Sequence, residues 1–320
     1  MPVPIFLPAD AAGIARAAQA LRSGELVAFP TETVYGLGAD ATRDDAVAKI
    51  FAVKERPEFN PLIIHVDAVD KLDPIIVWNT PARLLATRFW PGPLTLVLPA
   101  SAHCPVSLLA RAGLPSLAVR IPAHPIARAL LSAVDVPIAA PSANRSGNLS
   151  PTTPLHVQAS LGDRLNFILA AGRTQVGIES TILDLTGAQP TLLRPGGTSI
   201  EQIEQSLGQT VAAGIVDPMH PTSPGQLLRH YAPTRPLRLN VTTARDDEAF
   251  ILFGSELGLR GGAHRRNLSP TGDLGEAAAH LFAVLHECDA MDISGIAVTS
   301  IPEVGLGRAI NDRLRRAATP

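Results

Sequence analysis

The segment Phe29-Pro30-Thr31-Glu32-Thr33-Val34-Tyr35-Gly36-Leu37-Gly38 marks where the first predicted strand gives way to a polar loop. The apolar run Leu26–Phe29 predicts a buried strand that Pro30 ends. Hydroxyl groups and glycines then crowd together, and this pattern predicts a turn in which Gly36 and Gly38 are tight-turn residues. Such a loop offers a place for a small polar metabolite.

Lys54-Glu55-Arg56-Pro57 follows shortly afterwards, at the end of a helix predicted to start at Asp44. Lys49, Lys54 and Lys71 are the three lysines of the chain, and the other 24 of its 27 basic residues are arginines. A compact ammonium suits phosphate oxygens that are approached as a point charge. Cations at a helix end also compensate the helix dipole, so both interpretations of Lys54 and Arg56 stay open here.

Strands interleaved with helices predict an α/β domain over residues 1–211. Some strands follow one another without a helix between them, so the sheet is expected to be mixed. The predicted strands are 26–29, 62–66, 94–98, 117–121, 138–140, 167–169 and 181–185. The predicted helices are 10–22, 44–56, 81–89, 125–133, 154–161 and 200–207.

Residues 212–236 are rich in proline and have little periodicity, which predicts a linker. An ordinary spacer would have little use for Arg229-His230-Tyr231 at its centre, so we expect this linker to act as a lid. Residues 237–320 predict a second, smaller α/β unit, with strands 237–241, 250–253 and 295–298 and helices 274–288 and 304–316.

The formal charge is −2, from 27 basic and 29 acidic residues, and neither half of the chain carries a basic excess. Bulk charge therefore gives no support for gripping a nucleic-acid backbone. Cys104 and Cys288 lack metal-ligand spacing, so neither a zinc site nor a disulfide framework is expected. No signal peptide and no membrane-spanning apolar run is recognised, which predicts a cytoplasmic protein without membrane attachment.

Several other segments place small polar residues at the ends of predicted strands, where α/β sheets form ligand crevices. These segments contribute Ser142, Asn144, Ser180 and Arg194. His65 ends an apolar strand and has an ordinary structural explanation. Arg120 lies in an apolar strand and needs an anionic partner, which is either a substrate carboxylate or an acidic side chain.

Standard nucleotide cradles are missing from the sequence, because neither GxGxxG nor GxxxxGK[ST] occurs. Nucleophile elbows, diagnostic carboxylate pairs and kinase signatures are also missing. Composition and spacing alone therefore predict an α/β enzyme or binding protein for a small polar phosphorylated ligand.

Taken together, the separated motifs closely resemble the YrdC-like family in its two-domain, threonylcarbamoyl-AMP-forming branch. The motifs are Pro30–Leu37, Lys54–Pro57, Asn60–Leu62, Ser142–Asn144, Glu179–Thr181, Arg194–Gly196, Ser223–Gly225 and His230–Pro233. The resemblance covers nearly the whole chain. It implies a twisted mixed-sheet YrdC-like catalytic domain, a lid, and a smaller Rossmann-like α/β accessory domain.

The same resemblance implies synthesis of L-threonylcarbamoyladenylate and pyrophosphate from L-threonine, bicarbonate and ATP, with Mg²⁺ bound mainly through the polyphosphate. Downstream threonylcarbamoyl-transferase proteins would then modify the adenosine next to the anticodon of tRNA, with weak or no direct tRNA binding by this chain. The threonine site would contain Thr33, His65, Arg120, Ala140 (through its backbone) and Ser180. The ATP site would contain Lys54, Arg56, Asn60, Ser116, Ser142, Asn144, Ser150, Arg194, His230 and Tyr231, with Lys54 and Arg56 as catalytic cations. The resemblance leaves the metal ligands unassigned.

Two alternatives remain open at this stage. One is a carbamoyl-adenylating enzyme with another acceptor, although the cysteine-rich zinc motifs of the hydrogenase-maturation type are missing. The other is an RNA-binding module, which the near-neutral first domain disfavours.

Overall fold

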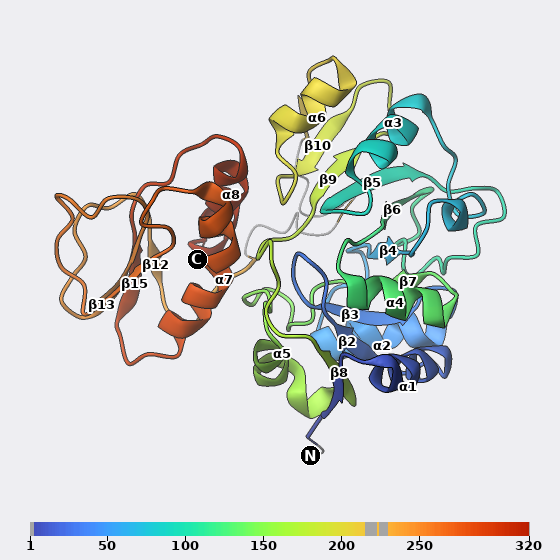
Figure 1. Ribbon diagram of the computed structural model, residues 1–320, viewed down its shortest axis with the longest axis horizontal. Coiled ribbons are helices and arrows are strands. Elements are labelled where there is room, and N and C mark those ends of the chain that lie inside the picture. Colours follow the sequence, from blue (N-terminus) through green and yellow to red (C-terminus); the bar gives the residue numbers. More distant parts are fainter. Residues whose placement is uncertain (1–2, 215–222, 224–229, 320) are drawn as a thin grey trace.

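The computed structural model describes residues 3–214, 223 and 230–319, which form two α/β units (Figure 1). In the first unit, eleven of the described strands form one mixed sheet, and in the second, four form a parallel sheet. The predicted fold class is confirmed. Arg229 and most of the proline-rich linker lie outside the described residues.

The elements of the first unit agree with the sequence pattern except at four strands: β1, β3, β10 and β11. Its strands are β1 (Ile5–Pro8), β2 (Val27–Phe29), β3 (Gly36–Asp40), β4 (Ile63–His65), β5 (Leu94–Pro99), β6 (Ser116–Arg120), β7 (Ile138–Ala139), β8 (Phe167–Ala170), β9 (Thr181–Asp184), β10 (Thr191–Arg194) and β11 (Ala212–Ala213). Its α-helices are α1 (Ala11–Arg22), α2 (Asp44–Lys54), α3 (Thr80–Phe89), α4 (Pro125–Val134), α5 (Pro154–Leu161) and α6 (Ile200–Leu207), with short 3₁₀ turns at Asp70–Leu72 and Gly162–Arg164. The strand order is β1-β8-β2-β3-β7-β4-β6-β5-β9-β10-β11.

The prediction of a tight turn at Gly36 and Gly38 is wrong, because both residues lie in β3. This strand pairs antiparallel with β2, so that Phe29 faces Gly36 and Val27 faces Gly38. A Cβ on Gly38 would come within 2.9 Å of the Phe29 ring. Gly38 therefore makes room for a neighbouring aromatic side chain, a packing requirement that local strand propensity does not reveal.

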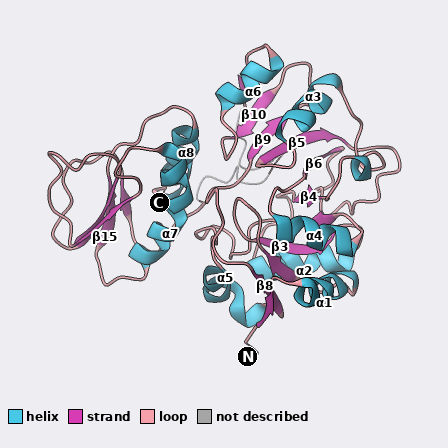
Figure 2. Cartoon of the chain, in the orientation of Figure 1, coloured by secondary structure: helices cyan, strands magenta, loops and turns pink. Residues whose placement is uncertain are grey.

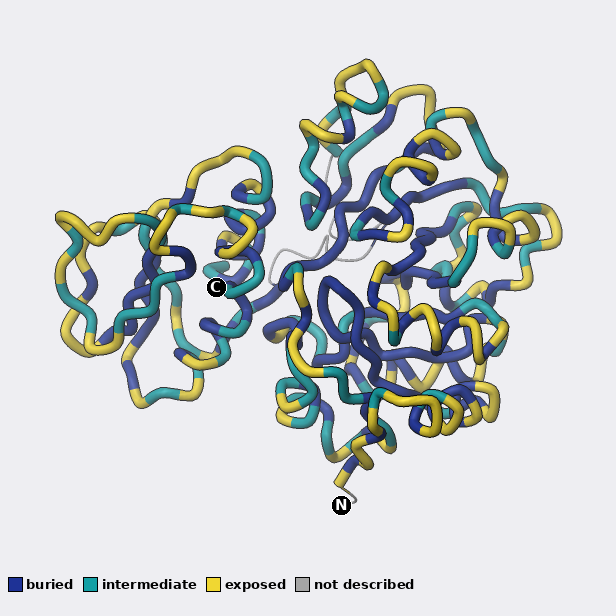
Figure 3. Tube along the Cα trace, in the orientation of Figure 1, coloured by how far each residue is buried: buried dark blue, intermediate teal, exposed yellow. Residues whose placement is uncertain are grey.

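The sheet of the first unit is covered on both faces. Val27 and Phe29 point into a cluster with α1 and α4, whereas Ala28 points into the larger core with α2 and α3. This alternation follows from the two-residue period of a strand. Figure 2 shows the helices on the sheet faces, and Figure 3 shows that the strands are buried while the outer turns are exposed. The strand ends that carry the polar loops are thus held by a rigid core.

The second unit contains β12 (Leu237–Arg238), β13 (Glu248–Leu252), β14 (His264–Asn267), α7 (Leu274–Asp289), β15 (Gly295–Val298) and α8 (Leu306–Ala317). Its strands follow the order β12-β15-β13-β14. β14 was not predicted because its sequence, His-Arg-Arg-Asn, carries no apolar pattern. Figure 1 shows α7 and α8 on the side of this sheet that faces the first unit.

The two units share a hydrophobic cluster. Val34, Leu149 and Ile178 of the first unit pack together with Tyr231 and with residues of α7 and α8. A Cβ on Gly177 would lie 2.5 Å from the Ala278 carbonyl oxygen, so α7 approaches the first unit as closely as backbone atoms allow. Both cysteines are free, and no helix among the described residues is long and apolar enough to cross a membrane.

Candidate active site

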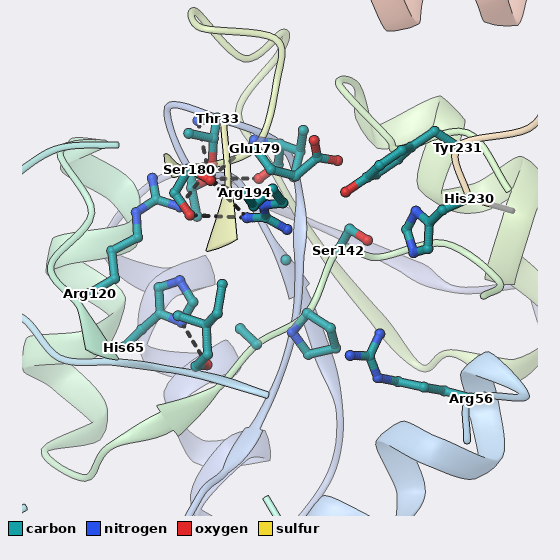
Figure 4. A pocket seen from close by; sticks show the side chains of 16 residues that line it. Thr33, Arg56, His65, Arg120, Ser142, Glu179, Ser180, Arg194, His230 and Tyr231 are labelled. Carbon is teal, nitrogen blue, oxygen red and sulfur yellow. Dashed lines mark hydrogen bonds between the residues drawn. The ribbon is translucent and has the colours of Figure 1, made fainter. Parts of the chain in front are cut away.

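A pocket forms where the β2–β3 loop, the segment after β7, the start of β9 and the end of β10 converge, and His230 and Tyr231 complete it (Figure 4). Ten of the residues predicted for the two substrate sites line this pocket. They are Thr33, Arg56, His65, Arg120, Ala140, Ser142, Ser180, Arg194, His230 and Tyr231. In Figure 4, His65 and Arg120 lie on one side, and Arg56, His230 and Tyr231 lie on the other.

Arg120 organises the first side of the pocket. Its guanidinium donates hydrogen bonds to the Glu32 carboxylate at 2.5 Å, to Thr33 Oγ1 at 3.0 Å and to the Gly92 carbonyl at 3.1 Å. Glu32 is therefore an anionic partner of Arg120 in this structure, and these three bonds use three of the five guanidinium N–H groups. Glu32 Oε2 is buried and has no hydrogen-bond partner among the described residues.

His65 lies beside Arg120 because β4 and β6 are parallel and place these two residues in register. Its Nδ1 is 3.1 Å from the Ile63 carbonyl oxygen. Burial, together with the nearby charge of Arg120, lowers the pKa of His65 to about 3. The imidazole is therefore neutral at physiological pH and contributes shape and hydrogen bonding rather than charge. The backbone N–H of Ala140 already donates to Ile63 O at 2.9 Å, so a backbone contact from Ala140 to a ligand would use its carbonyl.

Ser180 and Arg194 form the middle of the pocket. Arg194 Nη2 donates to the Ser180 carbonyl at 2.9 Å and to Ser180 Oγ at 3.2 Å. Thr95 Oγ1 lies 2.8 Å from the same hydroxyl. These contacts fix a buried guanidinium between the two sides of the pocket.

The second side of the pocket has a strongly positive environment. Arg56 donates to the carbonyls of Asn60 and Pro61, and burial and Arg194 lower its pKa to about 10. Burial lowers the pKa of His230 as well, and the charges of Arg56, Lys54 and Arg194 lower it further. Buried cations that disfavour one another in this way gain from an incoming anion, which makes this side suited to a polyphosphate.

Lys54 lies behind the pocket wall. Its ammonium donates to the Ser142 carbonyl at 2.6 Å and also to the Asn144 carbonyl, and it is 1% exposed. Burial, followed by the charge of Arg56, lowers its pKa well below the usual value. Lys54 thus fastens the loop that presents Ser142.

The other predicted ATP-site residues outside the lining are Asn60, Ser116, Asn144 and Ser150. Asn60 is fully buried, and neither polar atom of its side-chain amide has a hydrogen-bond partner among the described residues. Asn144 braces its loop through the Arg145 and Asn148 carbonyls, and Ser150 donates to Glu179. Ser116 begins β6, at the opposite end of that strand from Arg120.

Three acidic or basic residues around the pocket were not predicted as site residues. Glu32 and Glu179 stand inside the motifs quoted above, next to Thr33 and Ser180, and could have been found there. Arg313 is one of four arginines in α8 and carries no local signal. Among the described residues, no group of three His, Cys, Asp or Glu side chains could hold a metal ion.

Family models match both units of the chain. A family model described as "Telomere recombination" (Sua5_yciO_yrdC) matches residues 19–196, and one described as "Threonylcarbamoyl-AMP synthase, C-terminal domain" matches residues 198–319. A threonylcarbamoyl-AMP synthase of Pyrococcus abyssi is 42% identical over 94% of this chain and 93% of the relative. One of Bacillus subtilis is 41% identical over 95% and 92%. The crystal structure of P. abyssi Sua5 complexed with L-threonine matches with a TM-score of 0.89 at 38% identity, over 98% of this chain and 97% of that one.

Proposed function

The chain belongs to the threonylcarbamoyl-AMP synthase family, and we propose that the pocket joins L-threonine, bicarbonate and ATP into L-threonylcarbamoyladenylate and pyrophosphate. The observation that carries this proposal is the division of one pocket into two sides. Arg120, Thr33 and His65 offer a guanidinium, a hydroxyl and a neutral ring to a small amino acid. Arg56 and Arg194, with Lys54 behind them, offer positive charge to a polyphosphate.

At the amino-acid side, Arg120 would bind the threonine carboxylate. A planar guanidinium pairs with a carboxylate through two parallel hydrogen bonds, and the contacts to Glu32, Thr33 and Gly92 hold it in one orientation. Ser180 and the Ala140 carbonyl would contact the rest of the amino acid. The solved P. abyssi relative is complexed with L-threonine, which supports L-threonine as the amino acid that this chain binds.

The adenylation step needs little from protein acids and bases, whereas the threonine ammonium must first lose a proton to react. The threonine amine adds to bicarbonate with loss of water and gives a carbamate anion. A carbamate oxygen then attacks the α-phosphorus of ATP, the bond to the β-phosphate oxygen breaks, and pyrophosphate leaves. Because the nucleophile is already an anion, this second step depends on alignment and on neutralisation of phosphate charge. Arg56 and Arg194 would supply that charge, and Lys54 would hold the Ser142 loop at the required distance.

Mg²⁺ would enter with ATP. Because the described residues contain no metal-binding cluster of acidic, histidine or cysteine side chains, the phosphate oxygens would provide most of its ligands. Bound Mg²⁺ would supply further neutralisation of polyphosphate charge. Glu179 is already engaged by Arg313 and Ser150, which leaves it poorly placed to be a metal ligand.

The reactive adenylate would pass to a separate threonylcarbamoyl-transferase that modifies tRNA, and we propose that this takes place in the cytoplasm. A carbamoyl-phosphate mixed anhydride is open to hydrolysis, so closure of the pocket by His230 and Tyr231 would protect it. The formal charge of −2 supports weak or no direct binding of tRNA by this chain.

Pyrophosphate release tests the proposed function. Release from ATP should require both L-threonine and bicarbonate, and mass spectrometry should find the threonylcarbamoyladenylate. Equal release without threonine would contradict the assignment, and release that depends on carbamoyl phosphate instead would point to another acceptor.

A further inference from the structure

Arg313 belongs to the second unit but lies against the active site of the first. It extends from α8, its exposed fraction is 0%, and it is among the largest fully buried side chains of the described chain. Burying a guanidinium so completely is costly unless its charge and its N–H groups are engaged. What it contacts therefore indicates why it is there.

Three of its contacts lead to the pocket, and one of them is with Tyr231 on the proposed polyphosphate side. Arg313 Nε donates to Glu179 Oε2 at 2.7 Å, and Nη2 donates to the Pro195 carbonyl at 3.0 Å. Its guanidinium carbon lies 4.7 Å from the centre of the Tyr231 ring, within the range of a cation–π interaction. The fourth contact, with the neighbouring Asp312, stays within α8.

Each of these three partners is linked directly to the pocket. Glu179 and Tyr231 line it, and Pro195 follows Arg194, which also lines it. Burial would raise the pKa of Glu179, but Arg313 and Arg194 outweigh this effect and lower it, so the carboxylate stays ionised. The other Glu179 oxygen accepts a hydrogen bond from Ser150. None of the Arg313 contacts among the described residues is with Arg120, Thr33 or His65.

We propose that Arg313 is a positioning residue for the adenylation step, through which the C-terminal unit sets the placement of Glu179, Tyr231 and the segment after Arg194. It acts through these residues and does not itself contact the reacting atoms. This inference rests on the proposed function and gives the second unit a defined task. Loss of Arg313 should therefore impair the polyphosphate side of the pocket and spare threonine binding.

The test uses the full chain with Arg313→Met and Arg313→Lys. Threonine affinity is measured by calorimetry, and kcat and KM for ATP come from threonine-dependent pyrophosphate release. Arg313→Met should lower kcat by about 100-fold, the effect expected of a misplacement of about 1 Å, while the threonine Kd stays within about twofold. Arg313→Lys should recover part of the rate, because an ammonium can pair with Glu179 but cannot also reach Pro195 with a planar fork.

A second measurement reports on geometry without relying on catalysis. The chain has two tyrosines, Tyr35 and Tyr231, so 3-fluorotyrosine labelling should give two ¹⁹F signals, which Tyr35→Phe assigns. Arg313→Met should shift the Tyr231 signal and leave the Tyr35 signal in place. If the wild-type protein released no threonine-dependent pyrophosphate, the proposed function would fail, and the Tyr231 signal would still show whether Arg313 positions that ring.

Two further variants make the result decisive. Arg315→Ala, on the same helix, removes an exposed ion pair with Glu303 and should leave all readouts unchanged. Arg313→Met combined with Glu179→Gln removes both charges of this buried ion pair, so it provides a folded test if the single variant unfolds, and its kcat should be no lower than that of Arg313→Met. Wild-type kcat in a folded Arg313 variant, or threonine affinity that falls in step with kcat, would overturn the proposal.

Discussion

Replacing Lys54 with methionine should release the Ser142 loop and lower turnover strongly, while the free energy of unfolding falls only a little. Methionine nearly matches the length of lysine and removes its charge. In the structure Lys54 is buried, and it donates hydrogen bonds to the carbonyls of Ser142, at 2.6 Å, and of Asn144. Both carbonyls belong to the loop that leads from β7 into the pocket wall. We expect the variant to fold and to lose most of its activity.

The magnitude follows from these two hydrogen bonds. Each hydrogen bond from a charged donor contributes about 1.5–3 kcal/mol, so their loss removes about 3–6 kcal/mol. Methionine avoids the desolvation of a buried ammonium, which costs several kcal/mol and offsets much of that loss. The free energy of unfolding should therefore fall by only about 2 kcal/mol. Turnover should fall by about 100-fold, because a released loop misplaces Ser142 by about 1 Å.

The assay pairs urea unfolding with threonine- and bicarbonate-dependent pyrophosphate release. Lys49→Met is the matched control, since Lys49 lies on the same helix and donates one hydrogen bond at 2.7 Å to the Gly24 carbonyl, away from the pocket. Its turnover should equal that of the wild type. Turnover within about threefold of wild type in the Lys54→Met protein, given a misplacement expected to cost about 100-fold, would refute the reasoning. So would a loss of turnover that follows only the unfolded fraction.

Three further perturbations test other parts of the structure. Arg120→Lys should weaken threonine binding by about 10–100-fold, because it loses at least one charge-assisted hydrogen bond from a planar fork; unchanged affinity by calorimetry would contradict the assigned carboxylate site. Gly196→Ala should destabilise the fold by about 3 kcal/mol or more, since the new Cβ would lie 2.3 Å from the Ser180 carbonyl carbon; an unaltered thermal transition would show that this close approach is relieved easily. His65 is neutral in the folded protein, with a pKa of about 3, whereas the unfolded chain protonates it near pH 6.5. Its contribution to stability is therefore complete above pH 6.5 and declines on acidification, by about 2 kcal/mol at pH 5; urea unfolding at pH 7 and 5 should show this decline, and His65→Asn should reduce it.

The sequence was sufficient for the main features of the fold because its apolar patterns are strong. Strands such as β5, β6 and β15 are mainly apolar, and α4 and α7 have regular apolar faces. Two of the missed strands share a physical reason: β3 is rich in glycine and β14 in arginine, so neither shows a strand pattern. Pairing with neighbouring strands, rather than local propensity, forms them.

The family resemblance carried by the separated motifs implied most of the pocket lining. Some of these residues, such as Ser142, Ser180 and Arg194, also stand at strand ends, which meet in an α/β sheet. The sequence could not show how the charges pair. Lys54 and Arg56 are two residues apart, yet Arg56 lines the pocket while Lys54 fastens a loop 88 residues further along the chain. The sequence also did not identify Glu32 as the partner of Arg120, because these two residues are 88 positions apart.

By itself, then, the sequence determined which elements form, which loops are polar and which family the chain resembles, since periodicity and motif spacing are local properties. Only the tertiary structure determined which buried charged side chains pair with one another. Arg313, from the last helix, contacts Glu179 across 134 positions and joins the second unit to the pocket of the first. Such a pair is stable only because the surrounding fold excludes water and holds both groups at hydrogen-bonding distance, a condition that no local pattern encodes.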